Sequence, residues 1–173
     1  KILLNSYELL QVKFLEGLSY FKKLRIAIFL FNQFNKYKDA ESSIYKGIDG
    51  LIKKIYDRKL KLAILTNNKS QYAEEVLEKF NLTKFFDIII GFNEVSEVKP
   101  SPEGILKIIE MWKIKPSETI FIGDMTTDVD AGKSAEVKMI CVASGLAKKE
   151  SLLEHDPDIL VENTQELVNL FSF

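Results

Sequence analysis

The sequence predicts an α/β protein with a Rossmann-like, three-layer parallel sheet, preceded by a small helical subdomain. Two observations predict this fold class. From about residue 60 onward, short apolar runs alternate with amphipathic stretches, and a brief turn joins each pair. The 173 residues, 46% of them hydrophobic, are also enough to bury a sizeable core. We therefore expect a globular protein and exclude a disordered tail or a fibre.

Five apolar runs are expected to be strands, and the amphipathic stretches around them helices. The expected strands cover residues 60–66, 86–90, 119–123, 138–143 and 158–161. The expected helices cover residues 47–57, 69–80, 101–112, 126–135, 149–155 and 163–171. In the third of these helices, Ser101 is the expected N-cap and Pro102 the first helical residue.

The first 45 residues differ from the rest of the chain. They are rich in Phe, Leu, Tyr and Lys and contain no Pro, which favours two or three amphipathic helices. Residues 25–31 alone could equally form a buried strand. We therefore predict two domains, a helical subdomain at residues 1–45 and an α/β domain at residues 46–173.

Charge and composition exclude several classes of partner. The net charge of -1 and the pI near 6.0 provide no basic field for nucleic acid. The longest wholly apolar run, residues 26–31, is far shorter than the roughly 18 residues of a membrane helix. The single cysteine, Cys141, cannot form an internal disulfide and lies in an apolar run, so we expect a buried strand residue and a reducing compartment. The cytoplasm is the expected location.

The ends of the predicted strands carry the polar residues that point to chemistry. In open parallel sheets, ligands bind at the carboxyl ends of the strands. The first strand ends in Leu65-Thr66-Asn67-Asn68, which brings together a hydroxyl, an amide side chain and free helix-start N–H groups. Such a turn suits an anionic oxygen of a substrate. Thr66 and Asn67 could alternatively be capping residues only.

The third strand ends in Gly123-Asp124 and is followed by Asp128, so two carboxylates lie about one helical turn apart. This pair suits Mg²⁺, which usually takes one or two protein carboxylates together with waters and a substrate phosphate. Alternatively, Asp128 and Asp130 only favour the helix N-terminus through its dipole. Asp124 is harder to explain in that way, because carboxylates next to buried apolar runs need a partner.

Lys99 precedes Pro100 in the loop between the second strand and the third helix. A lysine at this position could reach across the strand ends and neutralise a phosphate. Lysines are numerous in this chain, so a solvated charge is the alternative.

The three segments together resemble the haloacid dehalogenase-like hydrolases. LTNN, KPSPEG at residues 99–104 and FIGDMTTD at residues 121–128 are similar to that family's motifs II, III and IV, in the same order. The resemblance covers about residues 45–170. Within the family, the sequence looks most like the branch of the phosphoglycolate phosphatases and β-phosphoglucomutases. It also implies that the helices before residue 45 form the family's small cap.

The resemblance implies a role for each matching residue. Thr66 would hydrogen-bond the transferring phosphoryl group and Lys99 would steady the phosphate and the nucleophile, with Asn67 also on the substrate side. Asp124 and Asp128 would hold Mg²⁺ directly or through water. The acid at Asp124 is the pattern of the family's magnesium-dependent phosphatases, not of its metal-free dehalogenases. The implied substrate is a small phosphorylated metabolite, cleaved through a phospho-aspartate.

The family's motif I, a strand ending Asp-x-Asp-Gly-Thr that carries the nucleophile, has no match in this sequence. No acid follows an apolar, strand-like run before Leu60, and the nearest look-alike has Leu30 and Asn32 where two aspartates are needed. The motif is expected upstream of Lys1, in agreement with a first residue that is not Met. Alternatively, the chain is a pseudoenzyme that binds phosphate, magnesium or a partner protein. A chain without this central strand would have a gap in its sheet.

Overall fold

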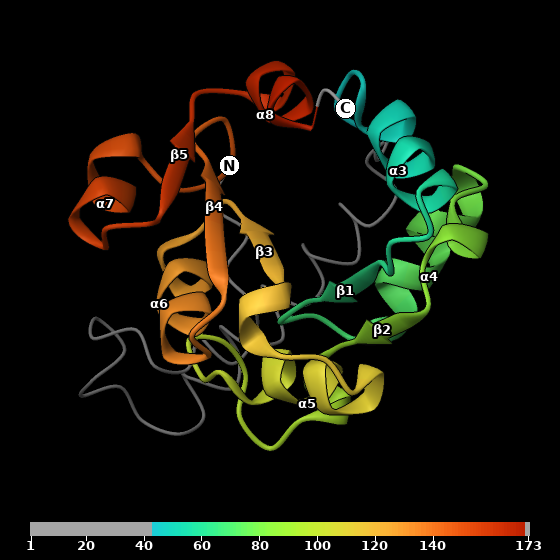
Figure 1. Ribbon diagram of the computed structural model, residues 1–173, viewed down its shortest axis with the longest axis horizontal. Coiled ribbons are helices and arrows are strands. Elements are labelled where there is room, and N and C mark those ends of the chain that lie inside the picture. Colours follow the sequence, from blue (N-terminus) through green and yellow to red (C-terminus); the bar gives the residue numbers. More distant parts are fainter. Residues whose placement is uncertain (1–42, 172–173) are drawn as a thin grey trace, which may run out of the picture. The chain divides into compact units, whose positions relative to one another are not determined.

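The computed structural model describes residues 43–171, and all of these after residue 43 belong to one compact unit, Ile44–Phe173. The helices expected before residue 43 therefore lie outside the described residues. Within the described range, the element order confirms the predicted alternation of strands and helices (Figure 1). No helix of this range is long and apolar enough to cross a bilayer.

The strands form two parallel sheets. The first pairs β1 (Ala63–Leu65) with β2 (Ile88–Ile90). The second has the order β3 (Ile120–Gly123), β4 (Lys138–Val142) and β5 (Ile159–Val161). Every strand pair is parallel, as the alternation of strands with helices predicts.

The helices expected after residue 46 are all present. They are α3 (Ile48–Asp57), α4 (Ser70–Lys79), α5 (Glu103–Trp112), α6 (Thr126–Ser134), α7 (Lys149–Glu154) and α8 (Thr164–Leu170). Three short 3₁₀ turns join them to the strands: η2 (Thr83–Phe85), η3 (Phe92–Glu94) and η4 (Pro116–Glu118).

The start of α5 differs from the prediction by one position. Pro102, not Ser101, is the N-cap, and the helix begins at Glu103. Pro102 has no backbone N–H group. The Ser101 hydroxyl oxygen therefore accepts the N–H of the following residue, Glu103, at 3.3 Å.

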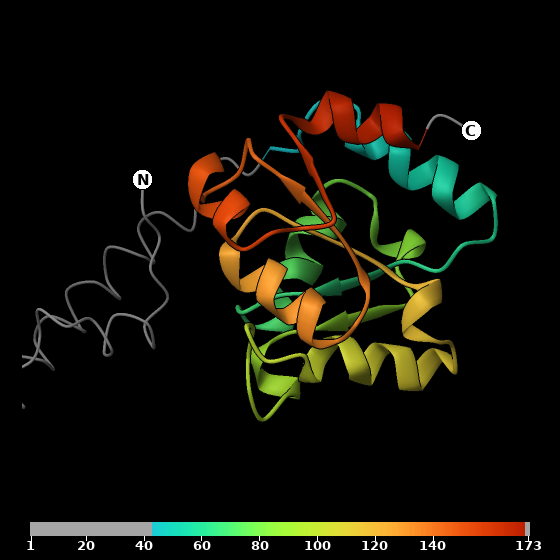
Figure 2. The same cartoon turned by 60° about the vertical axis from the view of Figure 1, so that its left-hand side comes forward.

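Alternating residues of β4 show the three layers. Met139 and Cys141 point to one face, where they pack with residues of α6 and α7. Ile140 and Val142 point to the other face, against residues of α3 and α8. Figure 2 shows α3 and α8 above the strands and α5 below them. The predicted buried position of Cys141 is confirmed, because its side chain is 0% exposed.

Helix α5 joins the cores of the two sheets. Its Ile105 and Ile109 pack in a cluster that includes Leu65 of β1 and Phe121 of β3. The contact with β1 is close, since a Cβ on Gly104 would lie 2.4 Å from a methyl carbon of Leu65. A glycine at this position therefore lets the helix approach the first sheet.

The edges of β1 and β3 have no partner among the described strands. β1 pairs only with β2, and β3 only with β4. Ile120 and Ile122 of β3 remain 50% and 37% exposed, although β-branched apolar residues are usually buried. The described strands thus form two sheets where the family resemblance implies one sheet around a central strand.

Candidate functional site

Three segments meet at the carboxyl ends of the strands, and the Lys99 ammonium group joins them. Its Nζ atom donates a hydrogen bond to the backbone oxygen of Leu65, at 3.1 Å, and lies 2.7 Å from Oδ1 of Asp128. The side chains of Lys99 and Asp128 are only 12% and 5% exposed. One buried cation therefore links the end of β1 to the turn after β3, and Lys99 is not a solvated charge.

Both carboxylate oxygens of Asp128 are engaged. Oδ2 accepts the backbone N–H groups of Asp124 and Met125, each at 3.0 Å, while Oδ1 faces Lys99. A buried carboxylate needs such partners, because burial without them is costly. Asp128 thus closes the turn at the start of α6 and also pairs with Lys99. The turn requires Gly123, where a Cβ would lie 2.5 Å from Oδ2 of Asp128.

The two carboxylate oxygens of Asp124 differ in their contacts. Its Oδ2 accepts the N–H of Leu146 at 3.0 Å, and Oδ1 has no hydrogen bond with any described residue. The carboxylate lies against the loop after β4, where a Cβ on Gly145 would be 2.0 Å from Oδ2. The sequence analysis missed this contact, for which a glycine after the fourth strand was the only signal.

Asn67 binds the backbone of Lys99. Its Nδ2 donates to the Lys99 carbonyl oxygen at 3.0 Å, and its Oδ1 accepts the Lys99 N–H at 3.1 Å. The peptide bond from Lys99 to Pro100 is cis. Asn67 does not cap α4, whose N-cap is Lys69.

Thr66 is held by one contact with the neighbouring strand and one with its own turn. Its N–H donates to the backbone oxygen of Ile90 at 2.9 Å, and its Oγ1 accepts the N–H of Asn68 at 3.1 Å. The hydroxyl proton of Thr66 is donated to no residue that the structure describes, which leaves one donor at the end of β1.

A polar network that the sequence analysis missed supports the turn after β1. Glu94 accepts hydrogen bonds from the Ser70 hydroxyl, at 2.7 Å, and from the Gly91 N–H, at 2.6 Å. Asn93 Oδ1 accepts the Ser70 N–H at 3.2 Å. This network fixes the start of α4 against the loop after β2. The Gly-Phe-Asn-Glu segment after the second strand was the available signal.

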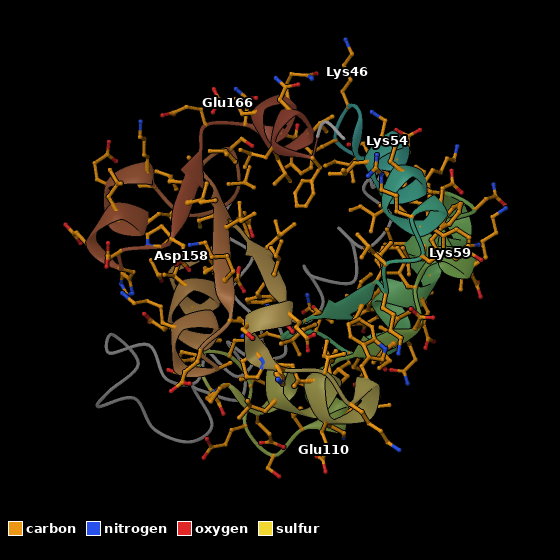
Figure 3. The ribbon with its side chains drawn as sticks, in the orientation of Figure 1. Lys46, Lys54, Lys59, Glu110, Asp158 and Glu166 are labelled. Atoms are coloured by element: carbon orange, nitrogen blue, oxygen red, sulfur yellow. The ribbon has the colours of Figure 1, made fainter. Side chains whose placement is uncertain are left out.

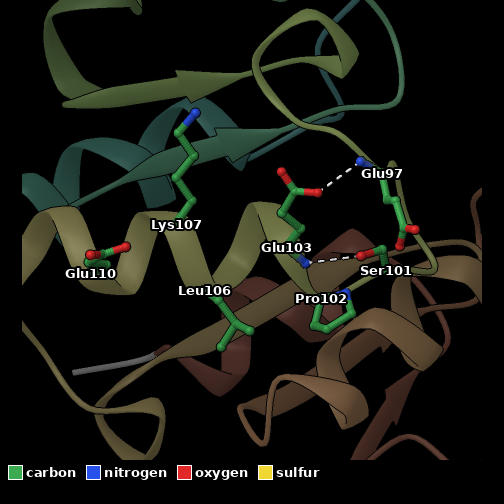
Figure 4. A pocket seen from close by; sticks show the side chains of 7 residues that line it. All are labelled: Glu97, Ser101, Pro102, Glu103, Leu106, Lys107 and Glu110. Carbon is green, nitrogen blue, oxygen red and sulfur yellow. Dashed lines mark hydrogen bonds between the residues drawn. The ribbon is translucent and has the colours of Figure 1, made fainter.

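Glu103 fixes the loop that leads to Lys99. Its two carboxylate oxygens accept the N–H groups of Ser96 and Glu97, at 2.7 and 2.8 Å. These backbone hydrogen bonds hold the pKa of Glu103 below its usual value. A shallow pocket lies along the outer side of this loop and α5 (Figure 4). Its lining residues are Glu97, Ser101, Pro102, Glu103, Leu106, Lys107 and Glu110.

Two other titratable residues lie outside these contacts. His155 Nδ1 is 2.6 Å from Oδ1 of Asp130, so this histidine links α7 to α6. Burial raises the pKa of Cys141 to about 11, with a further contribution from the charge of Asp128. Charges of both signs occupy the outer surface, as the side chains labelled in Figure 3 illustrate.

One carboxylate oxygen at the end of β3 suits a sparsely liganded magnesium ion. No group of three or more His, Cys, Asp or Glu in residues 43–171 is arranged to hold a metal. Mg²⁺ needs only one or two protein carboxylates when water and phosphate complete its shell. Oδ1 of Asp124 fits that requirement, whereas the oxygens of Asp128 are already engaged.

Comparison with known proteins identifies the family. Residues 6–142 match the family model described as "Haloacid dehalogenase-like hydrolase". The chain belongs to the haloacid dehalogenase-like hydrolases. It is similar to Pyrophosphatase PpaX of Halalkalibacterium halodurans, with 32% identity over 126 residues, 73% of this chain and 59% of that protein. A pyrophosphatase of Listeria welshimeri is 32% identical over 133 residues, 77% of this chain and 61% of that protein.

Solved structures of this family share the fold. A protein described as a predicted phosphoglycolate phosphatase, from Haemophilus somnus, aligns with a TM-score of 0.78 at 17% identity, covering 88% of this chain and 68% of that one. A haloacid dehalogenase-like hydrolase of Streptococcus pneumoniae aligns with a TM-score of 0.74 at 21% identity, covering 92% and 74%. The Rossmann-like α/β fold is thereby confirmed. The chain spans about three fifths of the length of the curated relatives named above.

Proposed function

We propose that this chain forms the phosphate- and magnesium-binding part of a phosphatase that acts on a small phosphomonoester. The observation that carries the proposal is the buried Lys99 ammonium group between the end of β1 and Asp128. A desolvated cation at the carboxyl ends of parallel strands suits a phosphate dianion, since electrostatic attraction is stronger where water is excluded.

The chain's own residues have distinct roles in this proposal. The Thr66 hydroxyl donates a hydrogen bond to a non-bridging phosphate oxygen, and Lys99 balances the charge of the phosphoryl group in the transition state. Asp128 holds Lys99 in place and could contact the metal only through water. Asp124 ligates Mg²⁺, which would supply a positive charge close to the phosphate.

The nucleophile in this proposal is an aspartate that is not part of this sequence. Its carboxylate oxygen forms a bond to phosphorus while the ester P–O bond breaks, and the leaving oxygen takes a proton from a general acid supplied with the nucleophile in motif I. Water then attacks the phospho-aspartate and releases inorganic phosphate. The alternative is a pseudoenzyme that binds phosphate and magnesium without hydrolysis. The names of the relatives, which are pyrophosphatases, argue for hydrolysis.

Two substrate classes are in question. Phosphoglycolate-like esters and sugar phosphates follow from the resemblance to the phosphoglycolate phosphatase branch. Pyrophosphate is the second candidate, because the relatives are named pyrophosphatases. We further propose that residues 1–45 form a helical cap subdomain, that residues 46–173 form the α/β domain, and that the protein acts in the cytoplasm.

Phosphate release tests this function. The protein with its nucleophile aspartate present is incubated with pyrophosphate and with a set of small phosphomonoesters, with and without Mg²⁺. We expect magnesium-dependent release, and a loss of at least about 100-fold in Asp124→Asn. Asp156→Asn is the matched control, since the Asp156 side chain is 89% exposed and pairs only with Lys133 among the described residues. Release without Mg²⁺, or an Asp124→Asn variant at the full rate, would contradict the proposal.

A further inference from the structure

Asn67 is the only side chain in the described range that hydrogen-bonds the backbone of Lys99. Its carboxamide uses Nδ2 and Oδ1 together, on the Lys99 carbonyl oxygen and the Lys99 N–H. The two residues are 32 positions apart, so this contact ties the turn after β1 to the loop before α5. A paired donor and acceptor on one peptide segment fixes its orientation as well as its distance.

The Lys99 side chain extends from this backbone segment across the strand ends. From a backbone held by Asn67, the side chain passes the ring of Phe121, 5.6 Å from Nζ, and ends between Leu65 and Asp128. Lysine side chains have several rotatable bonds, and holding one in a single conformation costs entropy. A fixed backbone lowers the number of conformations that remain to be restricted.

We propose that Asn67 is a positioning residue, which orients the Lys99 ammonium group toward Asp128 and the phosphate without touching substrate through its carboxamide. This inference rests on the proposed function and deepens it. It also changes the role that the sequence analysis expects for Asn67, from substrate contact to support of Lys99.

A double-mutant cycle tests the inference without any assay of activity. Asn67 and Asp128 share no hydrogen bond in the structure, but both bind Lys99. Urea unfolding of Asn67→Ala, Asp128→Asn and the double variant gives the coupling between the two positions. We expect a coupling of about fivefold in the unfolding equilibrium constant, because a displaced Lys99 no longer stabilises Asp128.

The same cycle in a Lys99→Met background tests whether the coupling between Asn67 and Asp128 is mediated by the Lys99 side chain. If Asn67 acts through Lys99, the coupling disappears in that background. Additive effects in the wild-type background, or an unchanged coupling in the Lys99→Met background, would overturn the inference.

Kinetics of the single variant Asn67→Ala provide a second test that does not need the Asp128 variant to fold. A misplaced Lys99 stabilises the transition state less well, so we expect kcat to fall by about 10- to 100-fold and KM to change by less than about twofold. A direct substrate contact would instead raise KM with kcat unchanged, and this result would overturn the inference.

Asn163→Ala is the matched control for a lost asparagine hydrogen bond. Asn163 caps α8 by accepting the Glu166 N–H at 3.0 Å, and it belongs to none of the site's segments. We expect this variant to be less stable, with kcat and KM unchanged. If the wild-type protein with its nucleophile aspartate present releases no phosphate at all, the proposed function fails, and the double-mutant cycle alone decides the role of Asn67.

Discussion

The ends of β1 and β3 hold their functional side chains in different ways. At the end of β3, Asp128 binds the N–H groups of Asp124 and Met125, at most four positions away. At the end of β1, Lys99 arrives from a loop 34 positions beyond Leu65 and is oriented by Asn67. The acidic end is therefore built by its own turn, whereas the lysine position depends on contacts between distant segments.

The two sheets also differ in burial. The sheet of β3, β4 and β5 packs Met139 and Cys141, both 0% exposed, against α6 and α7. In β1, all three residues are only partly buried. Because regions with less buried apolar surface open more easily, β1 should open before β4.

The largest effect is expected from removing the charge that joins the two ends. Asp128→Asn leaves the Lys99 ammonium group without its anion. The new NH₂ group also faces hydrogen-bond donors where a carboxylate oxygen accepted from them. We therefore expect a loss of about 3–5 kcal/mol in the free energy of unfolding. Urea denaturation measures it. Asp156→Asn, at the exposed ion pair with Lys133, should change the same quantity by less than about 0.5 kcal/mol. Equal losses in both variants would show that the Lys99–Asp128 pair has no special role.

The packing of α5 on β1 gives the next largest effect. In Gly104→Ala, the new methyl group meets Leu65 at 2.4 Å, so we expect a loss of about 1–3 kcal/mol in the free energy of unfolding. Gly50→Ala in α3 is the control, because a Cβ there meets nothing within 4 Å. The control should gain up to about 1 kcal/mol from helix propensity. Thermal unfolding of both variants measures whether Gly104→Ala loses stability while Gly50→Ala gains it.

Acid should weaken the loop that leads to Lys99. The folded pKa of Glu103 is lowered from 4.5, mainly by backbone hydrogen bonds from Ser96 and Glu97. Its contribution to stability is therefore present above about pH 4.5 and is lost as the pH falls through the folded pKa. The free energy of unfolding, measured by urea denaturation from about pH 7 to about pH 3, should fall less steeply with decreasing pH in Glu103→Gln than in the wild-type protein. The same pH dependence of the free energy of unfolding in both proteins would contradict this role of Glu103.

The smallest effect concerns thiol reactivity at the acidic end. Cys141 is 0% exposed and burial raises its pKa to about 11, so very little thiolate exists near neutral pH. A thiol reagent should label Cys141 only as fast as the second sheet opens, and labelling should become rapid in urea. Rapid labelling of the native protein would show that β4 is less protected than the packing indicates.

The sequence predicted the contacts between neighbouring residues of the site better than the contacts between residues far apart in the chain. The Gly-Asp turn after an apolar run indicates where Asp124 and Asp128 lie, because the contacts that hold Asp128 are within its own turn. The same analysis located Lys99 but missed its link to Asn67, since 32 residues of intervening chain determine whether the two meet. Similarly, the helix pattern located α5 to within two residues, while the approach of Gly104 to Leu65 required the packed structure.

The binding of inorganic phosphate tests the central claim that the strand ends form one phosphate site. Calorimetry measures it for the wild-type protein with and without Mg²⁺, and for Thr66→Val, which replaces the hydroxyl group with a methyl group and also removes the acceptor of the Asn68 N–H. We predict binding that strengthens with Mg²⁺ and weakens by about tenfold or more in Thr66→Val, the loss expected for one hydrogen bond to a charged group. No phosphate binding, or equal binding by the two proteins, would contradict the account.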